Sequence, residues 1–233
     1  MHMARHLTAD EVREEHVTAM GPRLGPVYNV LWNELVWLNA KWREYIELYG
    51  GSQTRLDLLN RSARFFFHMV QRALWETILL HLTRLSDEPT TGGKSNLTVL
   101  RLPALVDDEV LREELSGLVT AVTAKTKFAR RWRNRVFAHT DFETALGQGA
   151  EPLENASRHD VEDSLKSIGA VLNRMHTHYL GSNVLFEPLT ASATGSIGLL
   201  YVLRDGLAAE KKRHQRLREG RPDPDDIGPG RAI

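Results

Sequence analysis

The sequence predicts an all-α protein. Apolar residues recur every three to four positions in several long segments, which is the spacing of one face of an α-helix. Stretches rich in glycine and proline separate these segments, as breaks between helices do. No segment shows a convincing alternation of apolar and polar residues, and only residues 183–189 weakly resemble a strand. We therefore expect a helical bundle.

A glycine- and proline-rich break separates the first two predicted helices. Residues 8–20 form a short helix that Thr8 can cap, and acidic residues follow in its first turn. A second, stronger helix covers residues 27–49 and ends at Gly50, a typical stop. The break between the two helices contains four residues that interrupt a helical pattern: Gly21, Pro22, Gly25 and Pro26.

The longest predicted helix covers residues 54–85 and has two distinct faces. One face is apolar and aromatic, so we expect it in the centre of the fold or in an oligomer interface. A second face leads toward Glu76 and carries four cationic or titratable residues: Arg61, Arg64, His68 and Arg72. This polar face fits a solvated surface, or alternatively a wall that faces phosphate opposite a second basic segment.

Four more helices, a loop and a tail complete the predicted order. Residues 87–95 read as a loop, and a short helix follows at about 97–105. The remaining predicted helices cover residues 108–137, 157–179 and 192–218. Three prolines and three glycines in the last 15 residues predict a flexible tail over residues 219–233.

Composition excludes several classes of protein. The chain lacks cysteine, which excludes disulfides and thiolate metal sites and suits a reducing cytoplasm, where we expect the protein to reside. No run of about 18 apolar residues could cross a membrane, and the start has no apolar core of a signal peptide. Lys and Arg number 30, and so do Asp and Glu, so any contact with nucleic acid must be local.

The spacing of the histidines predicts no metal or cofactor. A helical di-iron site needs a Glu three residues before a His, and none of the ten histidines has one. There is no His-Glu-x-x-His pattern, no nucleophile elbow and no glycine-rich dinucleotide turn. Any catalysis would therefore depend on ordinary side chains.

The basic segment is the candidate site. It begins at Lys125, closes on His139 and Asp141, and contains no acidic residue before them. Its cations are Lys125, Lys127, Arg130, Arg131, Arg133 and Arg135. A cation cluster that ends in an imidazole can hold a phosphodiester and move protons beside it. Alternatively, these cations merely suit a helix C-terminus, where the helix dipole and Asp141 would stabilise them.

A helical wheel makes the geometry of this segment specific. A continuous helix would place Arg135 and His139 on the face of Phe128 and Trp132. That face would border a groove or a partner subunit, or else the helix ends near residue 137. In a straight helix Arg133 and His139 lie about 120° apart, so a working site needs the helix to end or bend between them.

The stretch from Arg133 and Asn134 to His139 resembles the Arg-x(4–6)-His signature of the HEPN superfamily. Together with residues 56–62 and 82–87, it is similar to the branch of the abortive-infection protein AbiU. The resemblance covers about residues 25–180. It implies a HEPN-like bundle in a single domain over 1–218, with an additional C-terminal helix at about 192–218.

The resemblance also implies a function. Many HEPN members are metal-independent endoribonucleases that act as toxins or antiviral effectors, and they usually dimerise. By this resemblance His139 would transfer protons, Arg133 would hold the scissile phosphate, and Asn134 would orient the phosphate or the imidazole. Glu76 would be a supporting acid. RNA would also contact Lys127, Arg130, Arg131 and Arg135.

Three functional hypotheses follow from these observations. The first is a HEPN-type ribonuclease that works as a homodimer in a toxin–antitoxin or antiviral setting, with a cognate antitoxin as a candidate partner. The second is a non-catalytic helical module that binds RNA, a nucleotide or a protein partner. The third is a helical protein whose aromatic helices simply build an oligomer.

Overall fold

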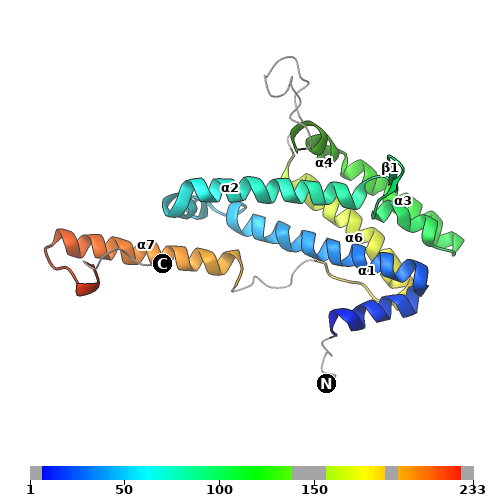
Figure 1. Cartoon of the computed structure of the whole chain (residues 1–233), viewed down its shortest axis with the longest axis horizontal. Coiled ribbons are helices and arrows are strands. Elements are labelled where there is room, and N and C mark those ends of the chain that lie inside the picture. Colours follow the sequence, from blue (N-terminus) through cyan, green and yellow to red (C-terminus); the bar gives the residue numbers. More distant parts are fainter. Residues whose placement is uncertain (1–6, 138–155, 187–193, 227–233) are drawn as a thin grey trace, which may run out of the picture. The chain divides into compact units, whose positions relative to one another are not determined.

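The computed structural model describes residues 7–137, 156–186 and 194–226, and this part of the chain is almost entirely helical, as predicted (Figure 1). Its helices are α1 (Ala9–Tyr49), α2 (Gln53–Ser86), η1 (Val99–Leu105), α3 (Glu109–Lys125), α4 (Lys127–Trp132), η2 (Arg133–Phe137), α6 (Arg158–Leu180), α7 (Ser196–Arg218) and η3 (Pro224–Asp226). None of the helices in these ranges has a stretch long and apolar enough to cross a membrane.

The chain divides into two compact units. The first unit contains Met1–Trp42 and Leu74–Pro188, and the second contains Arg43–Ala73 and Leu189–Ile233. Both α1 and α2 therefore contribute one part to each unit. The candidate basic segment belongs to the first unit.

The core of the first unit is built from α1, α2, α3 and α6. Each helix contributes fully buried aliphatic side chains at helical spacing, among them Leu31, Leu35, Leu38, Leu79, Leu82, Leu111, Leu115, Ile168 and Leu172. Polar contacts join α3 to α6 at both ends, since Glu114 pairs with Arg174 and Lys125 pairs with Asp163. The apolar faces predicted for these helices are the faces that pack.

The predicted break in α1 is a single kink at Gly21, with φ 81° and ψ 169°. Pro22 follows directly in the first helical turn, where a missing N–H is tolerated. The next segment starts earlier than the predicted residue 27 and includes Gly25 and Pro26. A Cβ at Gly25 would lie 2.5 Å from the Cα of Val17, so the two segments of α1 pack backbone to backbone at this point.

A second kink, in α2, was not predicted. Ala63 leaves the helical conformation, with φ −162° and ψ 72°. Neither glycine nor proline stands there to mark it. Close to the kink, the Tyr49 hydroxyl donates to the carbonyl oxygen of Phe67 at 2.8 Å, a tertiary contact that helical periodicity does not reveal.

The predicted loop at 87–95 contains a minimal antiparallel hairpin of β1 (Thr90–Thr91) and β2 (Lys94–Ser95). Gly92 and Gly93 form its turn with φ of 57° and 77°, a conformation that glycine adopts at low cost. Of the weak strand candidate, residues 183–186 contain no strand, and residues 187–189 lie outside the described ranges.

The prediction of one continuous helix over 108–137 was wrong. α3 ends at Lys125, Thr126 interrupts the helix, and α4 continues to Trp132. The final turn, η2, is a π-helix over Arg133–Phe137. Because a π-helix has more residues per turn than an α-helix, the wheel position projected for Arg135 no longer applies.

The ends of α6 and α7 follow capping chemistry. Ser157 and Asp160 form a capping box at the start of α6, and Gly181 ends it in the left-handed conformation, as predicted. α7 begins at Ser196, whose backbone N–H donates to the Glu44 carboxylate at 2.7 Å. Part of the predicted tail, residues 219–226, folds back on α7, and Asp226 pairs there with Arg216; residues 227–233 lie outside the described ranges.

Candidate functional site

The structure describes the first part of the candidate motif. Arg133 and Asn134 begin the π-helical turn η2, directly after α4. The Nε of Arg133 donates to the Asn134 side-chain oxygen at 3.0 Å, so the two side chains lie together. His139 and Asp141 lie outside the described ranges, and their predicted placement stays a prediction.

An ion pair holds Arg133 to the end of α2. Its Nη1 donates to both carboxylate oxygens of Asp87, at 2.8 and 2.6 Å. Both side chains are partly buried, with 29% and 22% of their surfaces exposed. Because Nε and Nη1 are both engaged, the guanidinium plane is fixed, and Nη2 has no hydrogen-bond partner among the described residues.

Arg130, one turn earlier, fastens α4 to the same end of α2. Its Nη1 donates to the Ser86 carbonyl oxygen at 2.8 Å and to the Ser86 hydroxyl at 3.2 Å. Its Nη2 donates to the Thr123 carbonyl oxygen at 2.6 Å. Burial lowers the pKa of Arg130, with nearby Arg133 acting in the same direction. Arg130 thus has a structural role, since its guanidinium joins α4 to the end of α2. Its contact with RNA stays a prediction.

The other predicted RNA-binding residues differ in exposure. Lys127 is exposed, whereas Arg131 and Arg135 are half-buried and each has an interaction of its own. Glu76, the predicted supporting acid, is half-buried on α2. It precedes Ser86 by ten residues, or roughly 15 Å along a helix, and among the described residues it forms no hydrogen bond or ion pair with Arg133. The structure therefore does not bring Glu76 to the Arg133 site.

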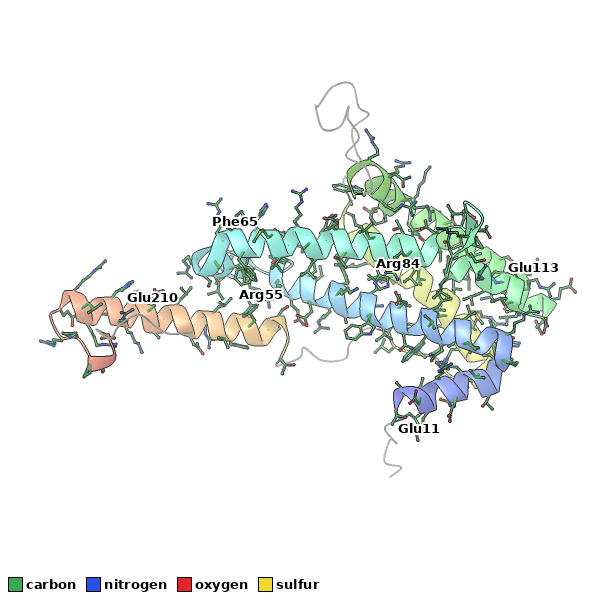
Figure 2. All side chains as sticks on the ribbon, viewed as in Figure 1. Glu11, Arg55, Phe65, Arg84, Glu113 and Glu210 are labelled. Atoms are coloured by element: carbon green, nitrogen blue, oxygen red, sulfur yellow. The ribbon has the colours of Figure 1, made fainter. Side chains whose placement is uncertain are left out.

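Beyond Asp87 lies a hollow of about 280 Å³ in the first unit. Glu34 of α1, Arg84 of α2 and Asn96 after the hairpin contribute to its wall, and Figure 2 labels Arg84. Glu34 also accepts from the buried His81 ring at 2.6 Å. Burial, together with neighbouring Lys41, lowers the pKa of His81. Cationic and anionic side chains therefore line the approach to Asp87.

The described residues contain no group of three or more His, Asp or Glu side chains that could hold a metal ion. The fixed Arg133 guanidinium, with the Asn134 amide beside it, suits an anionic ligand such as a phosphodiester.

Comparison with known protein families shows to which family this chain is related. The family model described as HEPN AbiU2 matches residues 23–196, which is most of the chain. The chain belongs to the HEPN AbiU2 family. Neither the curated proteins nor the solved structures provide a match. The match ends where α7 begins, so α7 and the segment after it stand outside the part that the AbiU2 model covers.

The ion pair between Asp87 and Arg133 joins two segments that resemble the AbiU branch of the HEPN superfamily. Residues 82–87 and the stretch from Arg133 carried the sequence resemblance separately, and the structure joins them through this ion pair. Asp87 itself was missed as a site residue. Its only signal in the sequence was its position in the resembling segment, because nothing in helical spacing links residues 46 positions apart.

Proposed function

We propose that this HEPN domain is a metal-independent endoribonuclease that cleaves RNA in a cleft shared by two copies of the chain. The observation that carries the proposal is the fixed Arg133 guanidinium, held by Asp87 and Asn134 at the start of the family motif. A positioned, partly buried cation whose Nη2 has no partner among the described residues is suited to a phosphate oxygen whose charge grows during reaction.

RNA supplies its own nucleophile, so this chemistry needs no metal. The 2′-oxygen forms a bond to phosphorus while the bond from phosphorus to the 5′-oxygen breaks. A base takes the proton of the 2′-hydroxyl, and an acid gives a proton to the departing 5′-oxygen. The products are a 2′,3′-cyclic phosphate and a 5′-hydroxyl.

The proposed roles follow from residue chemistry. His139 transfers a proton, because imidazole titrates near neutral pH. Arg133 binds the scissile phosphate, Asn134 orients it, and Arg135 assists. One histidine cannot easily act as base and acid in the same step, whereas two copies of the chain supply two histidines. We therefore propose that the active form is a homodimer.

The decisive experiment measures RNA cleavage in EDTA by the wild type and by His139→Ala. We expect the wild type to release fragments that end in a cyclic phosphate, and His139→Ala to be slower by at least about a hundredfold, the usual contribution of a general acid or base. His159→Ala is the matched control, since His159 is 79% exposed on α6 and outside the motif. Cleavage per chain should also rise with protein concentration if the dimer is the active form.

Equal cleavage by the wild type and His139→Ala would attribute the activity to a contaminating nuclease and remove the proposal. A loss of cleavage in His159→Ala as large as that in His139→Ala would indicate damage to the fold rather than to the site.

A second candidate function is a non-catalytic HEPN module that binds RNA, a nucleotide or a protein partner. The observation that favours it is the ion pair itself, because Asp87 offsets the charge that Arg133 would offer to a phosphate. Binding of several RNAs without cleavage of any would support this alternative. An effect of Arg133→Ala on oligomeric state alone would instead favour a structural role.

A further inference from the structure

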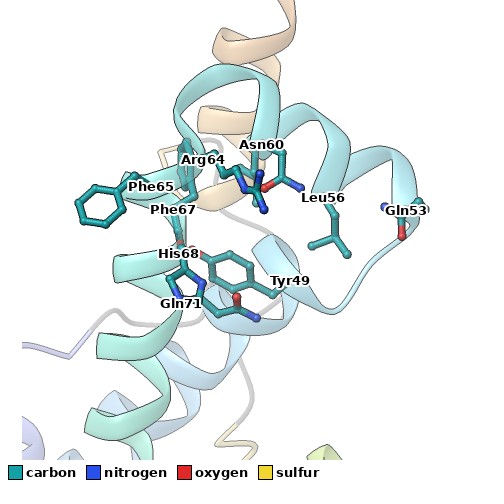
Figure 3. A pocket seen from close by; sticks show the side chains of 10 residues that line it. Tyr49, Gln53, Leu56, Asn60, Arg64, Phe65, Phe67, His68 and Gln71 are labelled. Carbon is teal, nitrogen blue, oxygen red and sulfur yellow. Dashed lines mark hydrogen bonds between the residues drawn. The ribbon is translucent and has the colours of Figure 1, made fainter.

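The kink at Ala63 borders a polar hollow in the second unit, well separated in sequence from the HEPN motif. The hollow has a volume of about 560 Å³ and is lined by the end of α1 and by α2 on both sides of the kink (Figure 3). This volume falls within the roughly 300–1,000 Å³ of small-molecule sites. None of the described residues that line the hollow carries a carboxylate, although the chain as a whole has as many acidic as basic residues.

Four polar side chains on the wall are available to a ligand. Arg64 and His68 lie one turn apart on α2, after the kink, and both are exposed. Asn60 stands before the kink and Gln71 after it. Within the described part of the chain, none of these four side chains has a hydrogen-bond partner. Figure 3 shows that they come from α2 on both sides of the kink and lie around one space with Tyr49.

The floor of the hollow is apolar and fixed. The Tyr49 hydroxyl donates to the Phe67 carbonyl oxygen at 2.8 Å, which ties the end of α1 to α2 beyond the kink. Burial, together with neighbouring Tyr45, raises the pKa of Tyr49 to about 12, so the hydroxyl keeps its proton. Leu59 and Phe67 are buried beside it, and Leu56 adds further apolar surface.

We infer that this hollow binds a nucleotide, with its phosphate at Arg64 and His68 and its base between the apolar floor and the two amides. A guanidinium beside an imidazole favours a phosphate group. Asparagine and glutamine amides each offer donors and an acceptor, which is what the edge of an unpaired base requires. The tyrosine and leucine surfaces suit the face of the base. The site is independent of the proposed cleavage chemistry.

The test is a binding measurement on the full chain with AMP and UMP, and with adenosine and inorganic phosphate as partial ligands. We expect AMP to bind more tightly than either partial ligand. Arg64→Gln should weaken AMP binding by about tenfold, the value of one charge-assisted contact, and leave adenosine binding nearly unchanged. The control is Arg72→Gln, which removes an exposed cation from the same helix outside the hollow.

A pentanucleotide distinguishes a free nucleotide from one within an RNA strand, using the His139→Ala chain to prevent cleavage. Tighter binding of the pentanucleotide than of AMP, lost in Arg64→Gln, would assign the site to RNA. Tighter binding of AMP would assign it to free nucleotides. Failure of AMP, UMP and the pentanucleotide to bind the wild type would overturn the inference, as would equal weakening by Arg64→Gln and Arg72→Gln. His68→Gln provides a second variant on the same wall.

Discussion

Arg133 and Asp87 show what residue types alone can and cannot predict. The arginine was identifiable from its spacing to Asn134 and His139, because a short motif lies within one stretch of chain. Its ionic partner was not, because helical periodicity gives no distance between residues 46 positions apart. Arg130 illustrates the same limit, since its bonds to the Ser86 and Thr123 carbonyl oxygens could not be predicted from the sequence, and its contact with RNA stays a prediction.

The residue-scale prediction concerns Asp87→Asn. Without its carboxylate, the Arg133 guanidinium loses the charge that fixes its plane, so we expect cleavage to fall by about tenfold or more through kcat, with KM little changed. The free energy of unfolding should fall by only about 0.5 kcal/mol, because the pair is only partly buried. Initial rates over a range of RNA concentrations give kcat and KM, and thermal unfolding of the same samples gives the change in stability.

Asp163→Asn is the matched control, because it removes an equally short ion pair with Lys125 on the other side of the basic segment. Its cleavage should match that of the wild type. Wild-type rates in Asp87→Asn would show that the ion pair does not position Arg133.

At the scale of elements, the ends of helices were more predictable than their interruptions. Gly21, Gly50 and Gly181 mark breaks that the sequence predicts, since glycine permits the conformations that end helices. The breaks at Ala63 and Thr126 have no such residue. Contacts between distant parts of the chain accompany both, as in the bond from Tyr49 to the Phe67 carbonyl oxygen.

The element-scale prediction compares two glycine substitutions. Gly25→Ala should destabilise the protein by about 1–3 kcal/mol, because its Cβ would lie 2.5 Å from the Val17 Cα and force two backbone segments apart. Gly117→Ala should stabilise it by about 0.5–1 kcal/mol, because alanine favours the interior of α3 and its Cβ would meet nothing within 4 Å. Urea unfolding of both variants beside the wild type measures the two effects. A stabilising Gly25→Ala would contradict the close packing within α1.

For the whole molecule, the two units differ in what they bury. Among its described residues the first unit holds three buried or half-buried histidines, His16, His81 and His176, and all five tryptophans of the chain belong to this unit. His16 lies against Asn29, Tyr28 and Trp32, and the His176 ring hydrogen-bonds to the Tyr28 hydroxyl at 3.0 Å. Tryptophan fluorescence therefore reports on the unit in which histidine protonation matters.

The last prediction is that the first unit loses stability on acidification. Burial is the main cause that lowers the pKa of all three histidines below the ordinary 6.5. The neighbouring His16 lowers the pKa of His176 further. Lys41 likewise lowers the pKa of His81 further, whereas Glu34 raises the pKa of His81. Between the lowered values and 6.5 the unfolded chain binds more protons than the folded chain. Stability is therefore fully present above pH 6.5 and falls as the pH drops below it, by about 1.4 kcal/mol per pH unit for each extra proton. The decline ends below the folded-state pKa values.

Urea midpoints from tryptophan fluorescence between pH 7.5 and 5.5 measure this slope. His16→Asn should flatten it, whereas His159→Asn should not, because His159 is largely exposed. An unchanged midpoint across this range would show that the three rings carry no such linkage.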